Sequence, residues 1–399
     1  MSGSEADPIE ITREFETSGS NQSGMRERNE RLVLSILRRQ GALPKVEIAR
    51  KTGLSAQTVS VIMRALETDG LLEKGEKLRG KVGQPSVPLR LAPDGAYFLG
   101  LKVGRRSAEL SLVNFIGEEL AHVKTTYSYP TPNETLEFVR SSVKSIFDKL
   151  PPDRRSRIAG MGIASPYYLW EWATVIGVDE SKMAAWKDCD LGAEVAKMYD
   201  FPVYFGNDAS CACGAELVFG TAPTPPDFLY IYLGYFVGGG VVLNGSLYTG
   251  SFGNAGAIGP FPTKSRDGRD TQLVDVASLI GLERRLLSAG LVPEVVLADR
   301  DNWNIDPALI DDWLDEAVPP LARVVQTAVS FIDFPAVLID GNMPTDLRSK
   351  VVAKVAEHLK ELDMSGLTVP DIRPGSVGPR ARSLGAASLP LSKRFMLET

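Results

Sequence analysis

Six residues between positions 56 and 64 have side chains suited to contact with the edges of DNA bases. Amide and guanidinium groups such as those of Gln57 and Arg64 form paired hydrogen bonds in a major groove, and small neighbours allow close approach. On the same stretch, apolar residues recur at intervals of three and four, which predicts a helix with its opposite face buried. The candidate contact residues are Ala56, Gln57, Thr58, Ser60, Val61 and Arg64, and the buried ones are Val59, Ile62, Met63 and Leu66.

Residues 43–72 predict the elements that position this helix, because they read as two short helices joined by a tight turn. Gly53 supplies the turn, Leu54 fills the gap between the helices, and Ser55 caps the second helix and is also expected to contact DNA. The alternative is a helical hairpin that only packs and contacts no DNA. In the first helix, the side chains expected to face inward are Val46, Ile48 and Ala49.

A β-ribbon with a basic tip is predicted after the second helix. Leu71–Glu73 and Val87–Leu91 pair around the loop GEKLRGKVGQPS. Residues 25–91 hold 14 Lys and Arg against 7 Asp and Glu, and a local basic excess on an acidic chain is typical of phosphate contact. We therefore expect a winged helix-turn-helix over residues 25–92 that binds double-stranded DNA. The tip contributes Lys77, Arg79 and Lys81, and a preceding helix over 29–40 turns Leu32, Ile36 and Leu37 inward.

The composition is that of an ordinary soluble chain. Its 399 residues, 44% of them hydrophobic, suffice for two or three globular domains. Residues 1–24 are rich in Ser, Gly and acids and are expected to be a disordered tail. No uninterrupted apolar run of about 18 residues and no secretory leader is present, so we expect a cytoplasmic protein without membrane contact. Three Cys and two His make a disulfide framework and histidine-centred catalysis poor candidates.

Residues 93–399 show a weak internal duplication, in which a meander of strands is followed by helices and a further strand. The second copy starts with the strands FLYIYL and VGGGVVL and has helices near 272–289 and 307–332 and a strand over 336–340. The fold class is α/β, with two lobes of roughly 93–225 and 226–399 and a small-molecule site expected in the cleft between them. In the first copy, the expected elements are strands 97–103, 107–114, 119–127 and 158–164 and a helix over 133–149.

The order of motifs resembles that of ROK-family transcriptional regulators, in a family of repressors, open reading frames and sugar kinases. The resemblance runs from about residue 25 to the end and implies an actin-like, ribonuclease-H-like body with two lobes. The residues that carry it are Gly83–Pro85, GNDASCACGAE at 206–216, GGGVVLNGSLYTGSFGNAGAIG at 238–259, AVLIDG at 336–341 and Leu384–Ala387.

The opening hairpin of the body departs from the pattern of family kinases. Those enzymes carry Asp-x-Gly-Gly-Thr there to place metal and phosphates, whereas this chain reads KVGRR from Lys102 to Arg106. An ammonium in place of the carboxylate removes a magnesium ligand, so we expect no kinase activity. We expect a plain hairpin turn with exposed basic residues here, and the alternative is a remodelled phosphate site. Gly238–Gly240, which lies where family kinases contact nucleotide, is expected to serve close backbone packing.

Asn207 and Asp208 match the family's Asn-Asp pair, in which the Asp is the base in kinases and binds the sugar hydroxyl in regulators. They lie between a predicted strand over 202–206 and a helix over 209–218, so the plainer interpretation is that Asp208 caps the helix. Lys182 replaces a family Asn and would attract a carboxylate or phosphate on a ligand, unless it is only a solvated surface charge. The residues expected to contact a sugar-like effector are Asn207, Asp208, Asn254, Gly256 and Lys182.

No cofactor and no metal are expected. Residues 261–277 contain neither Cys nor His, which the family's zinc site requires. Cys211 and Cys213 lie on a predicted helix, two residues apart, and are interpreted as small apolar fillers.

Together these observations predict a ligand-responsive DNA-binding transcriptional regulator, a repressor of a carbohydrate-related operon. It would act on double-stranded operator DNA as a homodimer or homotetramer, because one winged helix reads only a half-site. Two alternatives differ in what they bind. A sugar kinase with an appended DNA-binding domain would turn over ATP, and a DNA-binding protein whose body only dimerises would bind no small molecule.

Overall fold

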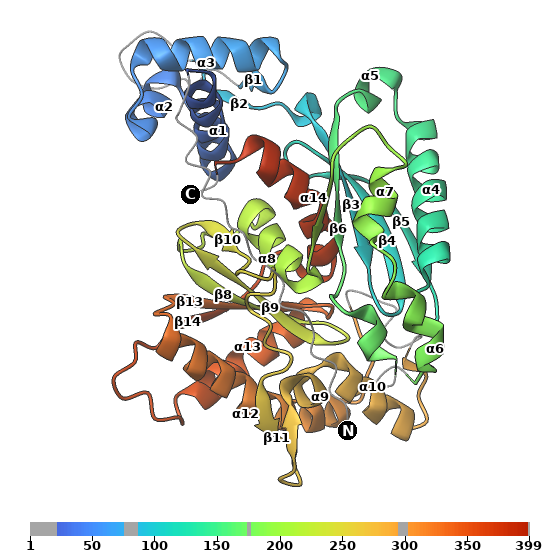
Figure 1. Cartoon of the computed structure of the whole chain (residues 1–399). Coiled ribbons are helices and arrows are strands. Elements are labelled where there is room, and N and C mark those ends of the chain that lie inside the picture. The colour runs from blue at the N-terminus through green and yellow to red at the C-terminus, as the bar shows by residue number, and fades with distance from the viewer. Residues whose placement is uncertain (1–21, 76–86, 174–176, 294–301, 398–399) are drawn as a thin grey trace, which may run out of the picture.

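The computed structural model describes residues 22–75, 87–173, 177–293 and 302–397. A small, mostly helical domain lies above two α/β lobes, and the last long helix runs between them (Figure 1). Within this described part of the chain, no helix combines the length and the apolar character that crossing a membrane requires.

The N-terminal domain consists of three helices and a short β-ribbon. Ser55 begins the third helix by accepting a hydrogen bond from Thr58 N at 3.1 Å, and Gly53 ends the second in the left-handed region, as predicted. Leu43 adds an isolated bridge to the ribbon through Leu89. The elements are α1 Gln22–Gln40, α2 Lys45–Thr52, α3 Ala56–Thr68, β1 Leu72–Lys74 and β2 Leu89–Leu91.

The buried face of this domain differs from the prediction in two helices. On α1 the buried side chains are those of Val33, Leu34 and Leu37, so the stripe is rotated by one residue from Leu32 and Ile36. On α2, Val46 is 77% exposed and Ile48 is fully buried. Residues two apart on a helix point to different sides, so Val46 and Ile48 cannot both face the core. The predicted stripe of α3 is confirmed, since Val59, Ile62, Met63 and Leu66 are all buried.

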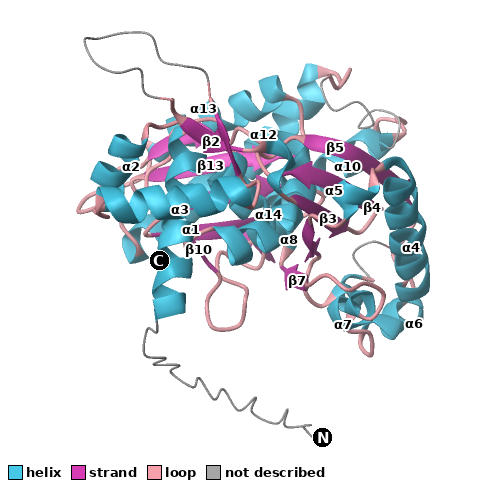
Figure 2. Ribbon diagram, turned by 90° about the horizontal axis from the view of Figure 1, so that it is seen from above, coloured by secondary structure: helices cyan, strands magenta, loops and turns pink. Residues whose placement is uncertain are grey.

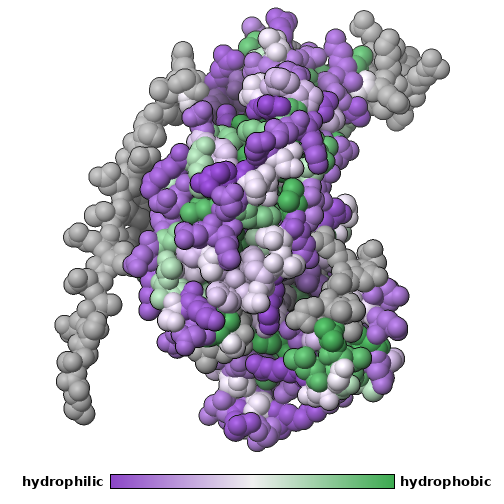
Figure 3. Space-filling model, turned by 90° about the vertical axis from the view of Figure 1, so that its right-hand side faces the viewer, coloured by the Kyte–Doolittle hydropathy of each residue, from purple (hydrophilic) through white to green (hydrophobic). Residues whose placement is uncertain are grey.

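The first lobe is built on a five-stranded sheet in the order β5-β4-β3-β6-β7. Strands β3, β4 and β5 form an antiparallel meander, and β6 and β7 extend it in parallel. Strands β3 and β6 are buried along their whole length. Helix α4 turns charged residues outward, and Figure 3 shows mostly hydrophilic side chains over the face of the molecule on that side. The bounds are β3 Tyr97–Val103, β4 Ser107–Asn114, β5 Glu119–Thr126, α4 Pro132–Lys149, β6 Ile158–Ala164 and β7 Val203–Gly206.

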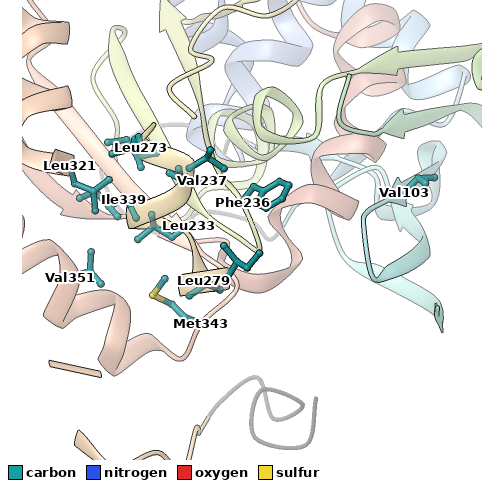
Figure 4. Close-up of a cluster of buried hydrophobic side chains, with 14 of the residues drawn as sticks. Val103, Leu233, Phe236, Val237, Leu273, Leu279, Leu321, Ile339, Met343 and Val351 are labelled. Carbon is teal, nitrogen blue, oxygen red and sulfur yellow. The ribbon is translucent and has the colours of Figure 1, made fainter. Parts of the chain in front are cut away.

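The second lobe repeats this plan, with a sheet in the order β10-β9-β8-β13-β14 that is antiparallel on one side and parallel on the other. The predicted duplication is therefore present in the topology. Figure 4 shows part of the apolar core beneath this sheet, where Leu233, Ile339 and Leu321 approach one another. The bounds are β8 Phe228–Leu233, β9 Val237–Leu243, β10 Ser246–Tyr248, α9 Leu273–Ala277, α10 Leu279–Ser288, α12 Pro307–Phe331, β13 Ala336–Gly341, α13 Thr345–Leu359 and β14 Asp371–Pro374.

Two helices tie the lobes together by crossing between them. Helix α8 (Asp208–Phe219) follows the first sheet in the chain but packs on β9 of the second, whereas α14 (Ala381–Phe395) follows the second sheet and packs on β3 and β6 of the first. The two helices also pack on each other. A Cβ on Gly385 would lie 1.8 Å from Cys211 O, so this contact requires glycine.

Short elements complete the described chain. Most of them lie in the connections of the first lobe, and β11 and β12 form a separate two-stranded hairpin in the second. They are η1 Pro93–Gly95, α5 Pro152–Arg155, η2 Leu169–Trp172, α6 Glu180–Met183, η3 Ala184–Trp186, α7 Leu191–Ala196, β11 Pro262–Lys264, β12 Asp270–Gln272 and η4 Gly378–Arg380.

Polar contacts fix the N-terminal domain on the body. Arg39 Nη2 donates to Gly245 O at 3.2 Å in the second lobe, and Arg157 Nη1 in the first lobe donates to Asp69 O at 3.4 Å. At the end of α14, Leu397 N donates to Ser35 Oγ at 2.9 Å. The domain that carries α3 therefore contacts both lobes and the helix that joins them.

Candidate functional site

The exposed face of α3 is the first candidate site. Gln57, Val61 and Arg64 are exposed along it, on the side away from the buried stripe. Arg64 also lines a shallow groove with Val61 and with Arg26 of α1, which places two guanidinium groups on one surface. Long donors next to an exposed apolar side chain match the requirements of base and phosphate contact in a major groove.

The hydroxyl residues on α3 have a different role from Gln57 and Arg64. Ser55 Oγ lies 2.8 Å from Thr58 Oγ1 and also accepts a hydrogen bond from Thr58 N, so these two side chains fix the start of the helix. Ser60 is half-buried. Lys77, Arg79 and Lys81, predicted for the tip of the wing, lie outside the described residues. At the base of the wing, Arg90 and Glu73 form an ion pair of 2.7 Å.

The second candidate site lies where α8 begins, between the lobes. Asn207 is the N-cap of α8, because its Oδ1 accepts hydrogen bonds from Ala209 N at 3.0 Å and Ser210 N at 3.3 Å. The plainer interpretation of Asp208 as the cap is therefore wrong. Asp208 is the first helical residue, and its carboxylate accepts a hydrogen bond from Arg382 Nη1 at 3.2 Å. Both side chains of this ion pair are 13% exposed.

Two of the three basic residues of the β3–β4 hairpin, Lys102 and Arg105, are buried, which contradicts the expectation of a turn with exposed charges, and Arg106 is exposed as expected. Lys102 is 4% exposed, and its Nζ donates to Ser107 Oγ at 2.7 Å and lies 3.5 Å from Glu109 Oε1. Burial, together with the neighbouring charge of Arg382, lowers the pKa of Lys102 to about 7, and the carboxylates of Glu109 and Asp208 oppose this shift.

Arg105 is 7% exposed and stacks on aromatic rings of both lobes. Its Cζ lies 3.7 Å from the ring centroid of Phe236, in the β8–β9 turn, and 4.5 Å from that of Trp172, in η2. Figure 4 shows the Phe236 ring pointing to the side on which Val103 of the hairpin lies. A guanidinium tolerates this burial because ring faces attract cations, which explains how a charged turn residue became part of an interlobe contact.

The remaining predicted contact residues are only partly brought together. Lys182 is exposed on α6, with Nζ 5.5 Å from the ring centroid of Tyr129, and α6 lies apart from α8 in both Figures 1 and 2. Asn254 is exposed in the loop after β10. That loop reaches the first lobe, because a Cβ on Gly253 would lie 2.7 Å from the hydroxyl of Tyr167.

Gly256 and the glycine run of β9 serve close backbone packing. A Cβ on Gly256 would lie 2.8 Å from the backbone of Gly240, and one on Gly240 would lie 2.4 Å from Cys213 Cβ. Cys211 and Cys213 are buried in α8, as apolar fillers should be. Among the described residues, no group of three or more His, Cys, Asp or Glu side chains is arranged to hold a metal ion.

Sequence reasoning missed the residues that dominate the interlobe site. Arg382 is 174 positions from Asp208, on a helix for which no periodicity pointed to the cleft. Tyr167 contacts the backbone of Asn207, and its ring centroid lies 5.9 Å from that of Phe205 and 6.3 Å from that of Tyr168, both of which are exposed. The one available signal was the pair of basic residues in the hairpin, which was interpreted as solvated.

Comparison with known proteins identifies the two parts of the chain. Residues 98–393 match the model of the ROK family, and residues 26–73 match that of a winged helix-turn-helix DNA-binding domain. An "Uncharacterized protein y4fQ" of Sinorhizobium fredii is 23% identical over 92% of this chain and 91% of its own length. A xylose repressor of Bacillus subtilis is 22% identical over 60% of this chain and 62% of its own length.

Solved structures support the same architecture. A ROK family transcriptional regulator, described as a homologue of the Escherichia coli MLC protein, matches 94% of this chain and 98% of its own with a TM-score of 0.66 at 19% identity. A ROK family glucokinase of Streptomyces griseus matches 74% of this chain and 99% of its own, with a TM-score of 0.55 at 20% identity. Because the family model spans most of the chain, the protein belongs to the ROK family and carries a winged helix-turn-helix at its N-terminus.

Proposed function

We propose that this protein is a DNA-binding transcriptional regulator, a repressor of carbohydrate-related genes, whose interlobe site senses a sugar-like effector. The observation that carries the proposal is the exposed face of α3, where Gln57 and Arg64 are presented by a capped helix. This face is backed by the small core of the N-terminal domain and stands on the outer surface of the molecule (Figure 1). A rigid helix with long donors on its free face is the element that enters a major groove.

A physical connection between the two candidate sites supports the sensing part of the proposal. Helix α14 begins beside the Arg382–Asp208 ion pair and ends beside α1. Near its end, Phe395 packs on Phe98 and Phe115, with ring centroids 5.8 Å and 5.0 Å away. The fifteen helical residues include Pro390, and the helix is held along its length by α8, β3 and β6, so a ligand that displaces one end would move the other.

The names of similar proteins favour carbohydrate as the class of effector. They include xylose repressors, and the solved relatives include kinases of sugars. These relatives are no more than 26% identical to this chain, so the individual sugar does not carry over to it.

A sugar kinase with an appended DNA-binding domain is the alternative. Lys102 stands where the resemblance places a metal-binding Asp, and the aromatic ring of Phe236 covers Arg105 in the same hairpin. A buried ammonium and an apolar ring are poor substitutes for a magnesium and phosphate site. A coupled assay of ADP release with a panel of hexoses and pentoses should give no signal above background, and sugar-dependent turnover would favour the alternative.

The decisive experiment is selection of DNA ligands with the full-length protein, followed by fluorescence anisotropy on the enriched duplex. Gln57→Ala and Arg64→Ala should each relax base preference at one position per half-site, by about 1–3 kcal/mol. Arg140→Ala on the outer face of α4 is the matched control, because it removes an exposed charge far from α3 and should leave affinity unchanged. Unaltered affinity and selectivity in the Gln57→Ala, Arg64→Ala double variant would remove α3 as the reading helix.

A further inference from the structure

The ionic groups between the lobes include two permanent cations, the guanidinium groups of Arg105 and Arg382. Asp208 and Glu109 are the carboxylates, and Lys102 is an amine whose positive charge is disfavoured by burial. They form one electrostatic group, because the charges of Arg382 and Asp208 act on both Lys102 and Arg105. Asp208 already accepts from Arg382, so in this weakly hydrated site the ring-stacked guanidinium of Arg105 favours a bound anion, since a buried charge lacks the solvation that water would provide.

The same place holds hydrogen-bond donors without acceptors. The buried Nε atoms of Arg105 and Arg382 and the Nε1 atom of Trp172 have no hydrogen-bond partner among the described residues. Trp172 lies against the Arg105 guanidinium, and Arg382 already gives one N–H to Asp208. Buried donors are normally satisfied, and unpaired guanidinium edges match the planar acceptors of a carboxylate or the oxygens of a phosphate.

The surroundings select for a ligand that also has hydroxyl groups and a ring. The ion pair with Arg382 uses Oδ2 of Asp208. The other carboxylate oxygen, Oδ1, can accept a hydrogen bond from a ligand hydroxyl. The exposed rings of Tyr168 and Phe205 pack on Tyr167, which contacts the backbone of Asn207, and they offer apolar faces. A neutral sugar would use these groups but would leave the guanidinium donors without an anionic acceptor.

We infer that the effector is an anionic sugar derivative, a sugar acid or sugar phosphate, whose oxyanion is bound by Arg105 and Arg382. This inference rests on the proposed function, because it takes the interlobe site as the effector site. Arg105 belongs to the first lobe and stacks on Phe236 of the second, so an anion bound at its guanidinium edge also contacts the joint between the lobes. The charge of the ligand is thereby linked to the relative position of the two lobes.

The test uses matched probes with the full-length protein: glucose, gluconate, glucuronate and glucose 6-phosphate, and xylose with xylonate. Isothermal titration should show one of the acidic probes binding at least tenfold more tightly than its neutral parent. The acids and the phosphate form separate arms, so a preference for one identifies the kind of oxyanion. Raising the salt from 0.05 to 0.5 M should weaken the acidic probe and leave the neutral one unchanged.

Arg105→Gln and Arg382→Gln should reduce this acid-to-neutral preference to about twofold or less, and Arg105→Lys should restore part of it. Arg106→Gln is the matched control, since Arg106 is the exposed neighbour in the same hairpin and should keep the full preference. Thermal melting identifies variants that fail to fold. Because the readout is a ratio of affinities, a loss of lobe packing alone would lower both affinities and keep the ratio.

Equal binding of neutral and acidic probes, unaffected by Arg105→Gln, would overturn the inference and leave the proposed function standing. Absence of binding by every probe would also overturn it. The operator affinity of the same preparation is measured separately and decides the proposed function, so the two failures are distinguishable.

Discussion

Arg382 and Asp208 form an ion pair of 3.2 Å although they lie 174 residues apart in the chain. Arg382 is the second residue of α14, and Asp208 is the first residue of α8. Helix α14 packs on the sheet of the first lobe and α8 on that of the second, so the pair spans the joint between the lobes. It also marks the position from which α14 extends for about 22 Å towards the N-terminal domain.

Asp208→Asn should abolish the response to effector while leaving basal DNA binding intact. Asn207 caps α8, so the substitution removes no cap. An amide still accepts from Arg382 but leaves its charge unbalanced, and we expect a loss of about 1–2 kcal/mol in the free energy of unfolding. Operator affinity with and without effector, measured by anisotropy, checks the prediction. Asp148→Asn in an exposed ion pair is the control, and a parent-like response of Asp208→Asn would move the effector site elsewhere.

The protein should bind an inverted repeat as a dimer or a pair of dimers, because one α3 of thirteen residues reaches only a half-site. Inserting about five base pairs between the half-sites turns one of them to the opposite face of the duplex, whereas inserting about ten restores the face. We expect the first insertion to reduce affinity to that of a single half-site and the second to recover part of it. Equal binding to all three spacings would contradict symmetric recognition.

The sequence was sufficient to predict the main helices and strands but not to predict which residues form the interlobe site. Strands 97–103, 107–114 and 158–164 are present with the predicted bounds, because continuous apolar runs between turn residues leave few alternatives. The cap at Ser55 and the buried stripe of α3 were also predictable from local patterns. Such features depend on residues that are neighbours in the chain.

The interlobe site depends on contacts between distant segments. Arg105 looked like a solvated turn residue, and only the second lobe's Phe236 makes its burial favourable. Arg382 joined the site through the crossing of α14 to the first sheet, which no local periodicity encodes. For Asp208 the capping alternative failed for a local reason, because Asn207 is the cap of α8, whereas the pairing of its carboxylate with Arg382 depends on a distant segment.

Lys102 should make the stability depend on pH. Its pKa is about 7 in the folded protein against 10.5 for an ordinary lysine, because burial disfavours the charged form. Between these values the unfolded chain binds a proton that the folded chain has released, so the free energy of unfolding rises with pH. Relative to Lys102→Met, the parent should gain about 2 kcal/mol between pH 7 and pH 9.

Urea unfolding of both proteins at several pH values measures this difference. Lys187→Met removes an exposed lysine of the same lobe and should show no such trend. A parent-minus-variant difference that stayed flat, or fell as the pH rose, would mean that Lys102 remains charged in the folded protein.

Coupling between effector and operator should pass through the end of α14 at α1. Leu397 N donates to Ser35 Oγ at 2.9 Å, and Phe395 packs on Phe98 and Phe115. Ser35→Ala leaves the amide without its partner, and Phe395→Leu loosens the aromatic contact, so both should weaken the mechanical link without touching either binding site. In the parent we expect effector to change operator affinity by roughly 5–150-fold, and operator to change effector affinity by the same factor, because coupling free energy is reciprocal.

In the two variants this factor should fall towards one while effector affinity in the absence of DNA stays within about twofold of the parent. Ser141→Ala, which removes a comparable helical serine hydroxyl on α4, is the control and should keep the full coupling. Titrating effector into protein alone and into the protein–operator complex gives both factors in one series. If the variants retain the parental coupling, α14 is not the connection, and the direct contacts of Arg39 with Gly245 and of Arg157 with Asp69 become the remaining routes between the lobes and α3.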